Sequence, residues 1–133
     1  MGELPRDQVE AFLADTLVKP AFGGRVFCVP DVLGTRKQET ASGAIVREYV
    51  YAYCQEYYPG AGRLELGTGE SVPVVLTARR TGGGYSLVGF QVPPDGGGGL
   101  EIFPPLIRWR IAAAERAVDL IDPAAQASAY FRL

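Results

Sequence analysis

The sequence has no histidine among its 133 residues. This absence excludes Ser-His-Asp and Cys-His mechanisms, metal sites built on imidazole, and the usual general base near neutral pH. Cysteine is scarce as well, since Cys28 and Cys54 are the only two and cannot complete a thiolate zinc site by themselves. We therefore expect no conventional catalytic residue, no metal site and no cofactor.

The two cysteines leave two interpretations open. If their segments form a hairpin that turns near Ser42, Cys28 and Cys54 lie almost opposite each other, and a cross-strand disulfide can form. The alternative is a pair of buried free thiols, because cysteine is among the residue types most often buried.

An excess of positive charge is lacking too, since thirteen basic residues stand against fifteen acidic ones, a formal net charge of -2. Nucleic acid is therefore not expected as a partner, because phosphate binding needs clustered positive charge. No run approaches the roughly 20 apolar residues of a membrane span. The first residues lack a secretion signal, so the chain as given is expected in the cytoplasm. A chain trimmed of a signal or lipid anchor would look the same, which leaves an exported or lipid-anchored protein as the alternative.

The clearest pattern that is present covers residues 43–58, GAIVREYVYAYCQEYY. Its residues alternate strictly between two kinds, which is typical of a strand whose two faces meet different surroundings. One face carries Tyr49, Tyr51 and Tyr53, and the other is small and aliphatic. We interpret this stretch as the central long strand of an antiparallel sheet, with the small residues under a helix and the tyrosines facing away from it.

The flanking segments predict the rest of the fold. Helical spacing of apolar residues indicates a helix over residues 5–19 and a second one that begins at Pro104-Pro105. The stripe of the second helix consists of Ile107, Ile111, Ala114, Val118 and Ile121. Further strands are expected over residues 25–36, 72–80 and 85–92, with a short strand or loop over 63–70. This order predicts one α+β domain over residues 1–133, with a curled, mainly antiparallel sheet of four to five strands between an N-terminal and a C-terminal helix.

The tyrosine strand also carries the first candidate site, made of Tyr49, Tyr51, Tyr53, Arg47 and Glu48. Tyrosine combines a large apolar body with a polar tip, so the row suits a pocket floor, a protein interface or a ladder that only stabilises the sheet. Glu48 interrupts the aliphatic face, so it lies at the sheet margin or is buried with a partner. A buried carboxylate beside a tyrosine would be a histidine-free acid/base pair.

Other ionisable groups near the strand are Asp31 and Glu56, for which an edge or surface ion pair is the simpler interpretation. Arg79 and Arg80 adjoin a glycine turn, with Arg36 and Arg47 as neighbours if the strands pair as expected. Such arginines hold a carboxylate or phosphate group with two parallel hydrogen bonds, or else form a solvated hairpin end. The apolar run over residues 102–107, with Trp109 after it, is interpreted as the anchor of the second helix in the core. Phe103 and Trp109 would instead mark a partner surface if they were exposed together.

Three motifs carry a family resemblance, which covers residues 25–111. They are YVYAYCQEYY, SVPVVLTARRTGGGYSLVGFQVPPDG and EIFPPLIRWRI. Their order is similar to that in small uncharacterised domains of Gram-positive bacteria, and the layout resembles the cystatin-like class, which includes the nuclear transport factor-like superfamily. The resemblance implies a curled antiparallel sheet with a helix against it. It implies no activity and transfers no catalytic residue, and its members often look exported or lipid-anchored.

These observations favour a non-enzymatic binding or protein-interaction domain, which we expect to be homodimeric. Its contact surface would be the tyrosine face or the C-terminal helix, and its partner a protein, either itself or another. The alternative is a small-ligand-binding protein or a histidine-free acid/base enzyme, with its pocket between the sheet and a helix.

Overall fold

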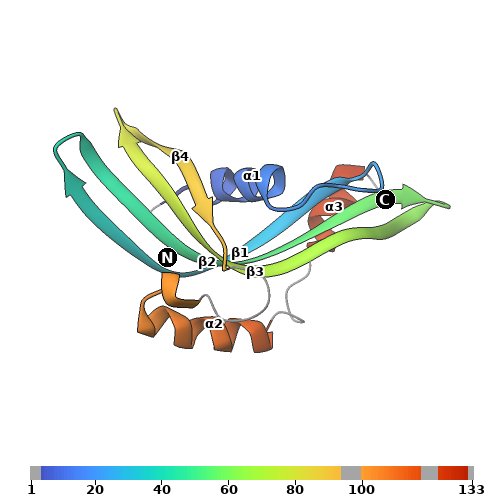
Figure 1. The fold of residues 1–133 in the computed structure, drawn as a ribbon. Helices are drawn as coiled ribbons and strands as arrows, with labels where there is room; N and C mark the ends of the chain where they lie inside the picture. Colours follow the sequence, from blue (N-terminus) through green and yellow to red (C-terminus); the bar gives the residue numbers. More distant parts are fainter. Residues whose placement is uncertain (1–3, 94–99, 118–122, 132–133) are drawn as a thin grey trace.

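The computed structural model describes residues 4–93, 100–117 and 123–131. Its elements follow each other as one helix, four strands and a C-terminal helical region (Figure 1). They are α1 (Arg6–Thr16), β1 (Arg25–Thr40), β2 (Gly43–Gly60), β3 (Arg63–Thr81), β4 (Gly84–Gln91), η1 (Leu100–Ile102), α2 (Pro105–Ala117) and α3 (Ala124–Phe131). The predicted α+β class is confirmed. Two positions of the predicted C-terminal stripe, Val118 and Ile121, lie outside the described residues.

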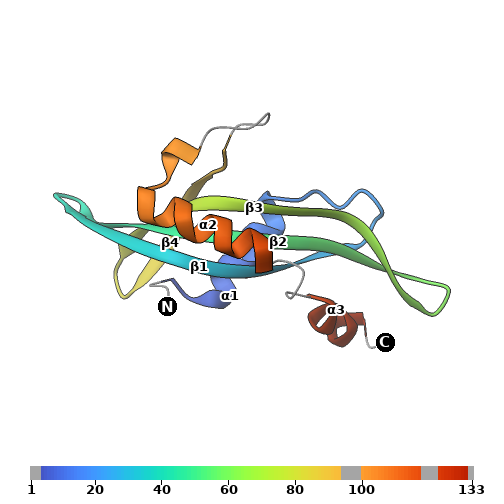
Figure 2. The ribbon, with the colours of Figure 1, turned by 90° about the horizontal axis from the view of Figure 1, so that it is seen from below.

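The four strands form one antiparallel sheet in the order β1-β2-β3-β4. Figure 1 shows α1 on one side of this sheet and α2 on the other. Seen from the α2 side, α2 lies in front of the strands at an oblique angle to them and α1 lies behind them (Figure 2). The expectation of a curled sheet was wrong in degree, because the sheet is not strongly curled. Its long strands bend moderately, and α1 lies on the inner side of the bend.

β3 is one strand of 19 residues, where the sequence suggested a short separate segment over 63–70. Gly67 and Gly69 lower its intrinsic strand propensity, but side chains of β2 occupy the space that a Cβ would need at both positions. A Cβ at Gly67 would meet Glu56 Oε1 at 2.5 Å, and one at Gly69 would collide with Gln55 Oε1. Pairing with β2 therefore overrides local propensity, and a register shift between Gln55 and Tyr57 accommodates the irregularity.

The face of the sheet toward α1 holds the larger core cluster. Val9 and Leu13 of α1 are buried against small residues of β2, among them Val50 and Ala52. Branched and small side chains leave room for a helix to approach a sheet closely, which is the physical reason for the small face of the alternating pattern. The prediction that these residues lie under a helix is confirmed.

A disulfide joins Cys28 to Cys54 inside this cluster. The two residues are directly opposite each other in the pairing of β1 with β2, as the hairpin interpretation requires. Of the two alternatives for the cysteines, the structure therefore has the disulfide. Among the described residues, no helix is both long enough and apolar enough to cross a membrane.

We predict that reducing the disulfide lowers the free energy of unfolding by about 3 kcal/mol, because the bond closes a long loop in the unfolded chain. The loop spans 26 residues in sequence. Urea unfolding with and without a reductant measures the change, and a Cys28→Ala/Cys54→Ala variant should show no effect of the reductant. Equal stability of the wild type in both conditions would contradict the prediction.

Candidate functional site

The tyrosine row lies on the face of the sheet away from α1, but most of it is not open. Tyr49 and Tyr51 are each 5% exposed and belong to a second core cluster beneath α2. The rings of Tyr49 and Phe103 are 6.1 Å apart, in a tilted contact. Burial raises the pKa of Tyr51, and the negative charge of Glu115 raises it further. Tyr51 therefore stays neutral at physiological pH, and both tyrosines serve as core residues for α2.

The row continues beneath α3. Phe27 of β1 contacts Tyr57 on the sheet and both Tyr130 and Phe131 of α3. The guanidinium carbon of Arg25 lies 4.3 Å from the centre of the Tyr130 ring, which adds a cation–π contact at the edge of the cluster. Tyr53, between the two helix-covered regions in sequence, is half-buried. Two helices of the same chain thus cover the surface that the sequence suggested for a partner.

Glu48 lies on the other face of β2, in the core under α1. Its side chain is almost fully buried, and its Oε2 atom accepts a hydrogen bond from the Leu4 amide at 3.2 Å, just before α1 begins. Neighbours in a strand point to opposite faces, so Glu48 does not share a face with Tyr49, Tyr51 or Tyr53. Glu48 therefore does not form the acid–tyrosine pair considered from the sequence with Tyr49, Tyr51 or Tyr53.

Glu56 is the second buried carboxylate on the α1 face, and its exposed fraction is 0%. Burial by itself raises the pKa of this group, but four backbone amides that donate to the carboxylate outweigh it and lower the pKa below its usual value. The donors are Ala21, Phe22, Gly24 and Thr68, at 2.8 to 3.4 Å. The sequence suggested a surface ion pair for Glu56. Its buried carboxylate instead binds backbone amides of the loop after α1 and of the irregular part of β3.

The two glutamates therefore do one job at the two ends of the first helix. Glu48 binds the segment that enters α1, and Glu56 binds the segment that leaves it. Polar groups inside a core need partners, and backbone amides outside regular structure need acceptors, so each satisfies the other. Both carboxylates therefore contribute to the position of α1 on the sheet.

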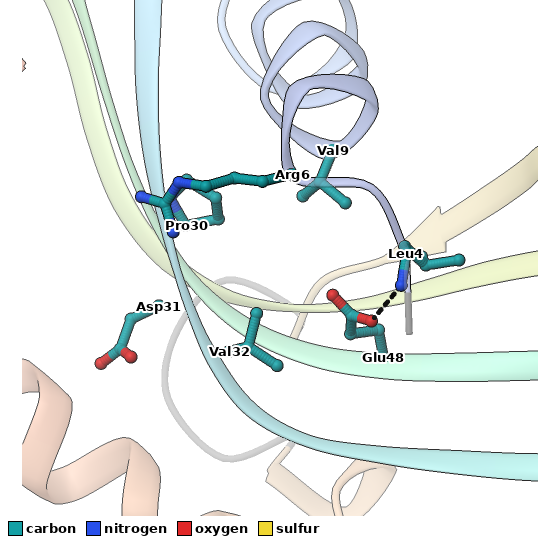
Figure 3. A pocket seen from close by; sticks show the side chains of 7 residues that line it. All are labelled: Leu4, Arg6, Val9, Pro30, Asp31, Val32 and Glu48. Atoms are coloured by element: carbon teal, nitrogen blue, oxygen red, sulfur yellow. Dashed lines mark hydrogen bonds between the residues drawn. The ribbon is translucent and has the colours of Figure 1, made fainter. Parts of the chain in front are cut away.

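A pocket of about 360 Å³ opens between the start of α1 and the β1–β2 part of the sheet. It is lined by Leu4, Arg6, Val9, Pro30, Asp31, Val32 and Glu48. In Figure 3 the Glu48 carboxylate points toward Leu4, whereas the Asp31 carboxylate points away from it. Within the described ranges, no group of three or more metal-ligating side chains is placed to hold an ion. The pocket is at the small end of ligand sites, and its buried charge is negative.

Arg47, the remaining residue of the sequence-predicted site, lies on the same face as the tyrosines, two positions before Tyr49. Arg36 is directly opposite it on β1, and Arg79 of β3 is directly opposite Ile45. Residues opposite each other in an antiparallel sheet point to the same side, so the pairing brings the three arginines to one face. Arg36 and Arg79 are exposed, and Arg47 is half-buried. Arg80 lies on the opposite face, because neighbours along a strand alternate.

The aromatic residues near the C-terminus divide between core and surface. Phe103 is buried beneath α2, whereas Trp109 is 72% exposed and Leu106 is 58% exposed. The sequence singled out the apolar run over residues 102–107 together with Trp109, and favoured a place in the core. The structure divides this set, because Leu106 and Trp109 lie outside the stripe of Ile107 and Ile111 that faces the core.

The chain was also compared with protein-family models, curated proteins and solved structures, and it has no match among them. Fold and site therefore rest on the structure itself, which supports an α+β fold with a four-stranded antiparallel sheet.

We predict that Glu56→Gln lowers the free energy of unfolding at pH 7 by about 3 kcal/mol, because buried amides lose a charged acceptor. The folded-state pKa of Glu56 is lower than its unfolded value of about 4.3, so the folded chain binds the proton less readily. The stabilisation by the ionised Glu56 is therefore fully present above the unfolded-state pKa and is lost as the pH falls through the folded-state pKa. Denaturant unfolding of both proteins across this range measures the effect.

The matched control is Glu70→Gln, an exposed carboxylate on β3, which should leave stability nearly unchanged. A stability difference between wild type and Glu56→Gln that did not shrink in acid would contradict the assignment of a lowered pKa.

Proposed function

We propose that this protein is a non-enzymatic interaction domain whose contact surface is the outward face of α2. The carrying observation is the exposure of Trp109, the largest apolar side chain, on an ordered helix. Of the two contact surfaces considered from the sequence, the tyrosine face is largely taken up by α2 and α3. The C-terminal helix is the one that remains available.

The outward face of α2 carries several apolar side chains where a surface helix is usually polar. Its exposed apolar residues are Pro105, Leu106, Trp109, Ala112 and Ala113, and the exposed Arg116 lies on the same face, two turns after Trp109. The inward face is apolar as well, with Ile107 and Ile111 in the core. A helix that is apolar on two sides marks a contact on the second side. Tryptophan beside arginine is also the composition enriched in interface hot spots, and Arg108 and Arg110 flank Trp109.

We infer that the occupant of this face is a second copy of the chain, packed with its α2 antiparallel to the first. An antiparallel pair centred on Ile111 sets Trp109 of each copy against the second copy's Ala113, so a large side chain meets a small one. It also brings Arg108 toward the second copy's Glu115, twice by symmetry. Such a self-complementary patch is what a two-fold interface needs.

A contact between single helices is small. The 13 residues of α2 offer less area than the roughly 1,200 Å² at the low end of stable complexes. We therefore expect weak association, with a dissociation constant of roughly 10 μM to 1 mM.

Trp109 is the only tryptophan, so its fluorescence reports directly on the proposed interface. We predict that sedimentation shows a dimer at high protein concentration and that the emission of Trp109 shifts to the blue in parallel, because the ring leaves water. Ala113→Glu should abolish both changes, since it places a charge where the indole packs. Leu66→Glu, at an equally exposed apolar residue on β3, is the control and should dimerise like the wild type. A wild type that stays monomeric at all accessible concentrations would refute the proposed self-association.

The disulfide supports a location for such a domain. Structural disulfides persist in oxidising compartments and are rare in the cytosol. Cys28 and Cys54 are bonded within the core, which favours the exported or lipid-anchored alternative over the cytoplasmic one.

A second candidate function is the binding of a small organic cation in the pocket of Figure 3. The observation that favours it is the buried Glu48 carboxylate in the pocket lining. We predict that butylammonium binds to the wild type and that Val32→Phe, which fills the pocket without removing Glu48, abolishes binding. Calorimetric titration measures both, with Leu66→Phe as a control for added aromatic surface. Equal binding by Val32→Phe would exclude the pocket.

A further inference from the structure

We infer that Arg36, Arg47 and Arg79 form a binding site for a phosphate group on the open end of the tyrosine face. This arginine site is separate from the outward face of α2 and does not depend on self-association. Its starting point is an unfavourable arrangement within the sheet.

Two arginines face each other across neighbouring strands. Arg36 and Arg47 are direct partners in the register of β1 with β2. Side chains at directly opposite positions have Cβ atoms roughly 5 Å apart, and like charges there destabilise the sheet. Arg79 of β3 adds a third positive charge. Its direct partner is Ile45, which lies two residues before Arg47 on β2 and therefore on the same face.

No carboxylate within the described part of the chain neutralises this group. The ion pairs formed there are Arg6 with Glu10 and Arg63 with Glu65. Arg47 meets only the amide oxygen of Gln38, at 3.5 Å, which is a long contact between a charged donor and a neutral acceptor. The chain has fifteen acidic residues and a net charge of -2, so the positive charge of these three arginines contrasts with the net negative charge of the whole chain. An anion from outside the chain would relieve the repulsion.

The number and type of the cations indicate a phosphate group. A guanidinium presents parallel N–H donors that match phosphate and carboxylate oxygens, and lysine lacks this fork. One arginine already suffices for the single charge of a carboxylate. Three arginines from three strands fit the nearly two negative charges and three outer oxygens of a phosphate monoester. Thr77, directly opposite Arg47, adds a hydroxyl donor at the same face.

The site is accessible. Arg36 and Arg79 are exposed, and Arg47 is half-buried, so its stem is supported while its head remains available. The helices that cover the tyrosine face contact Tyr49 and Tyr51 or the Phe27 end of the strands. The arginines lie beyond Tyr49, toward the β1–β2 turn.

Calorimetric titration with inorganic phosphate and with phosphoserine at low ionic strength tests the site. We expect binding of at least one of the two to the wild type, and the tighter one identifies whether the free ion or a phosphorylated side chain is preferred. Arg47→Gln should weaken binding roughly tenfold or more, because it removes charge-assisted hydrogen bonds. Arg116→Gln, an exposed arginine of α2, is the matched control and should bind as the wild type does. Succinate binding as tight as phosphate binding, or unchanged binding by Arg47→Gln, would overturn the inference.

Thermal unfolding supplies a second readout that needs no affinity. Relief of the Arg36–Arg47 repulsion should make Arg36→Gln more stable than the wild type in chloride buffer, and added phosphate should stabilise the wild type more than the variant. The comparison between proteins cancels the general stabilisation by phosphate salts. An equal response of the two proteins to phosphate would count against the site.

Discussion

The buried carboxylate of Glu56 is the interaction on which much of the fold depends. It is a full charge with no exposed surface, and it is tolerated because four backbone amides surround it. Its position dictates the sequence around it. A Cβ at Gly24 would clash with the Tyr57 carbonyl and come within 2.9 Å of Glu56 Oε2, and one at Gly67 would meet Oε1 at 2.5 Å. Removing the charge therefore disturbs the exit of α1 and the bulge of β3 together.

β2 separates two different tasks by its alternation. Its even-numbered positions fix α1, through small residues in the middle and through Glu48 and Glu56 toward the ends. Its odd-numbered positions fix α2 through Tyr49 and Tyr51, and Tyr57 contacts Phe27, which packs against α3. A strand used on both faces has no free surface along most of its length. This is why the interaction surface that we propose is on the covering helix and not on the strand.

The sequence predicted the local features of the strands well, but it did not predict which strand faces are covered by helices. Alternation over residues 43–58 identified the central strand and its small face, because the period of a strand is a backbone property. It did not reveal that Tyr49 and Tyr51 are buried, because that depends on where α2 packs, far along the chain. Continuity of β3 was missed for a related reason, since Gly67 is explained only by Glu56 on another strand. The outward direction of Trp109, in contrast, was available from its offset to Ile107 and Ile111.

Both proposed surfaces lie on the side of the sheet away from α1. The α1 side is stabilised by the disulfide, the apolar cluster and two buried carboxylates that accept hydrogen bonds from backbone amides. On the α2 side, an apolar helix face remains exposed and three arginines remain without a carboxylate partner among the described residues. Both features cost folding stability, because one exposes apolar area and the other sets like charges together. We therefore propose that binding, as well as folding, has shaped the α2 side of the sheet.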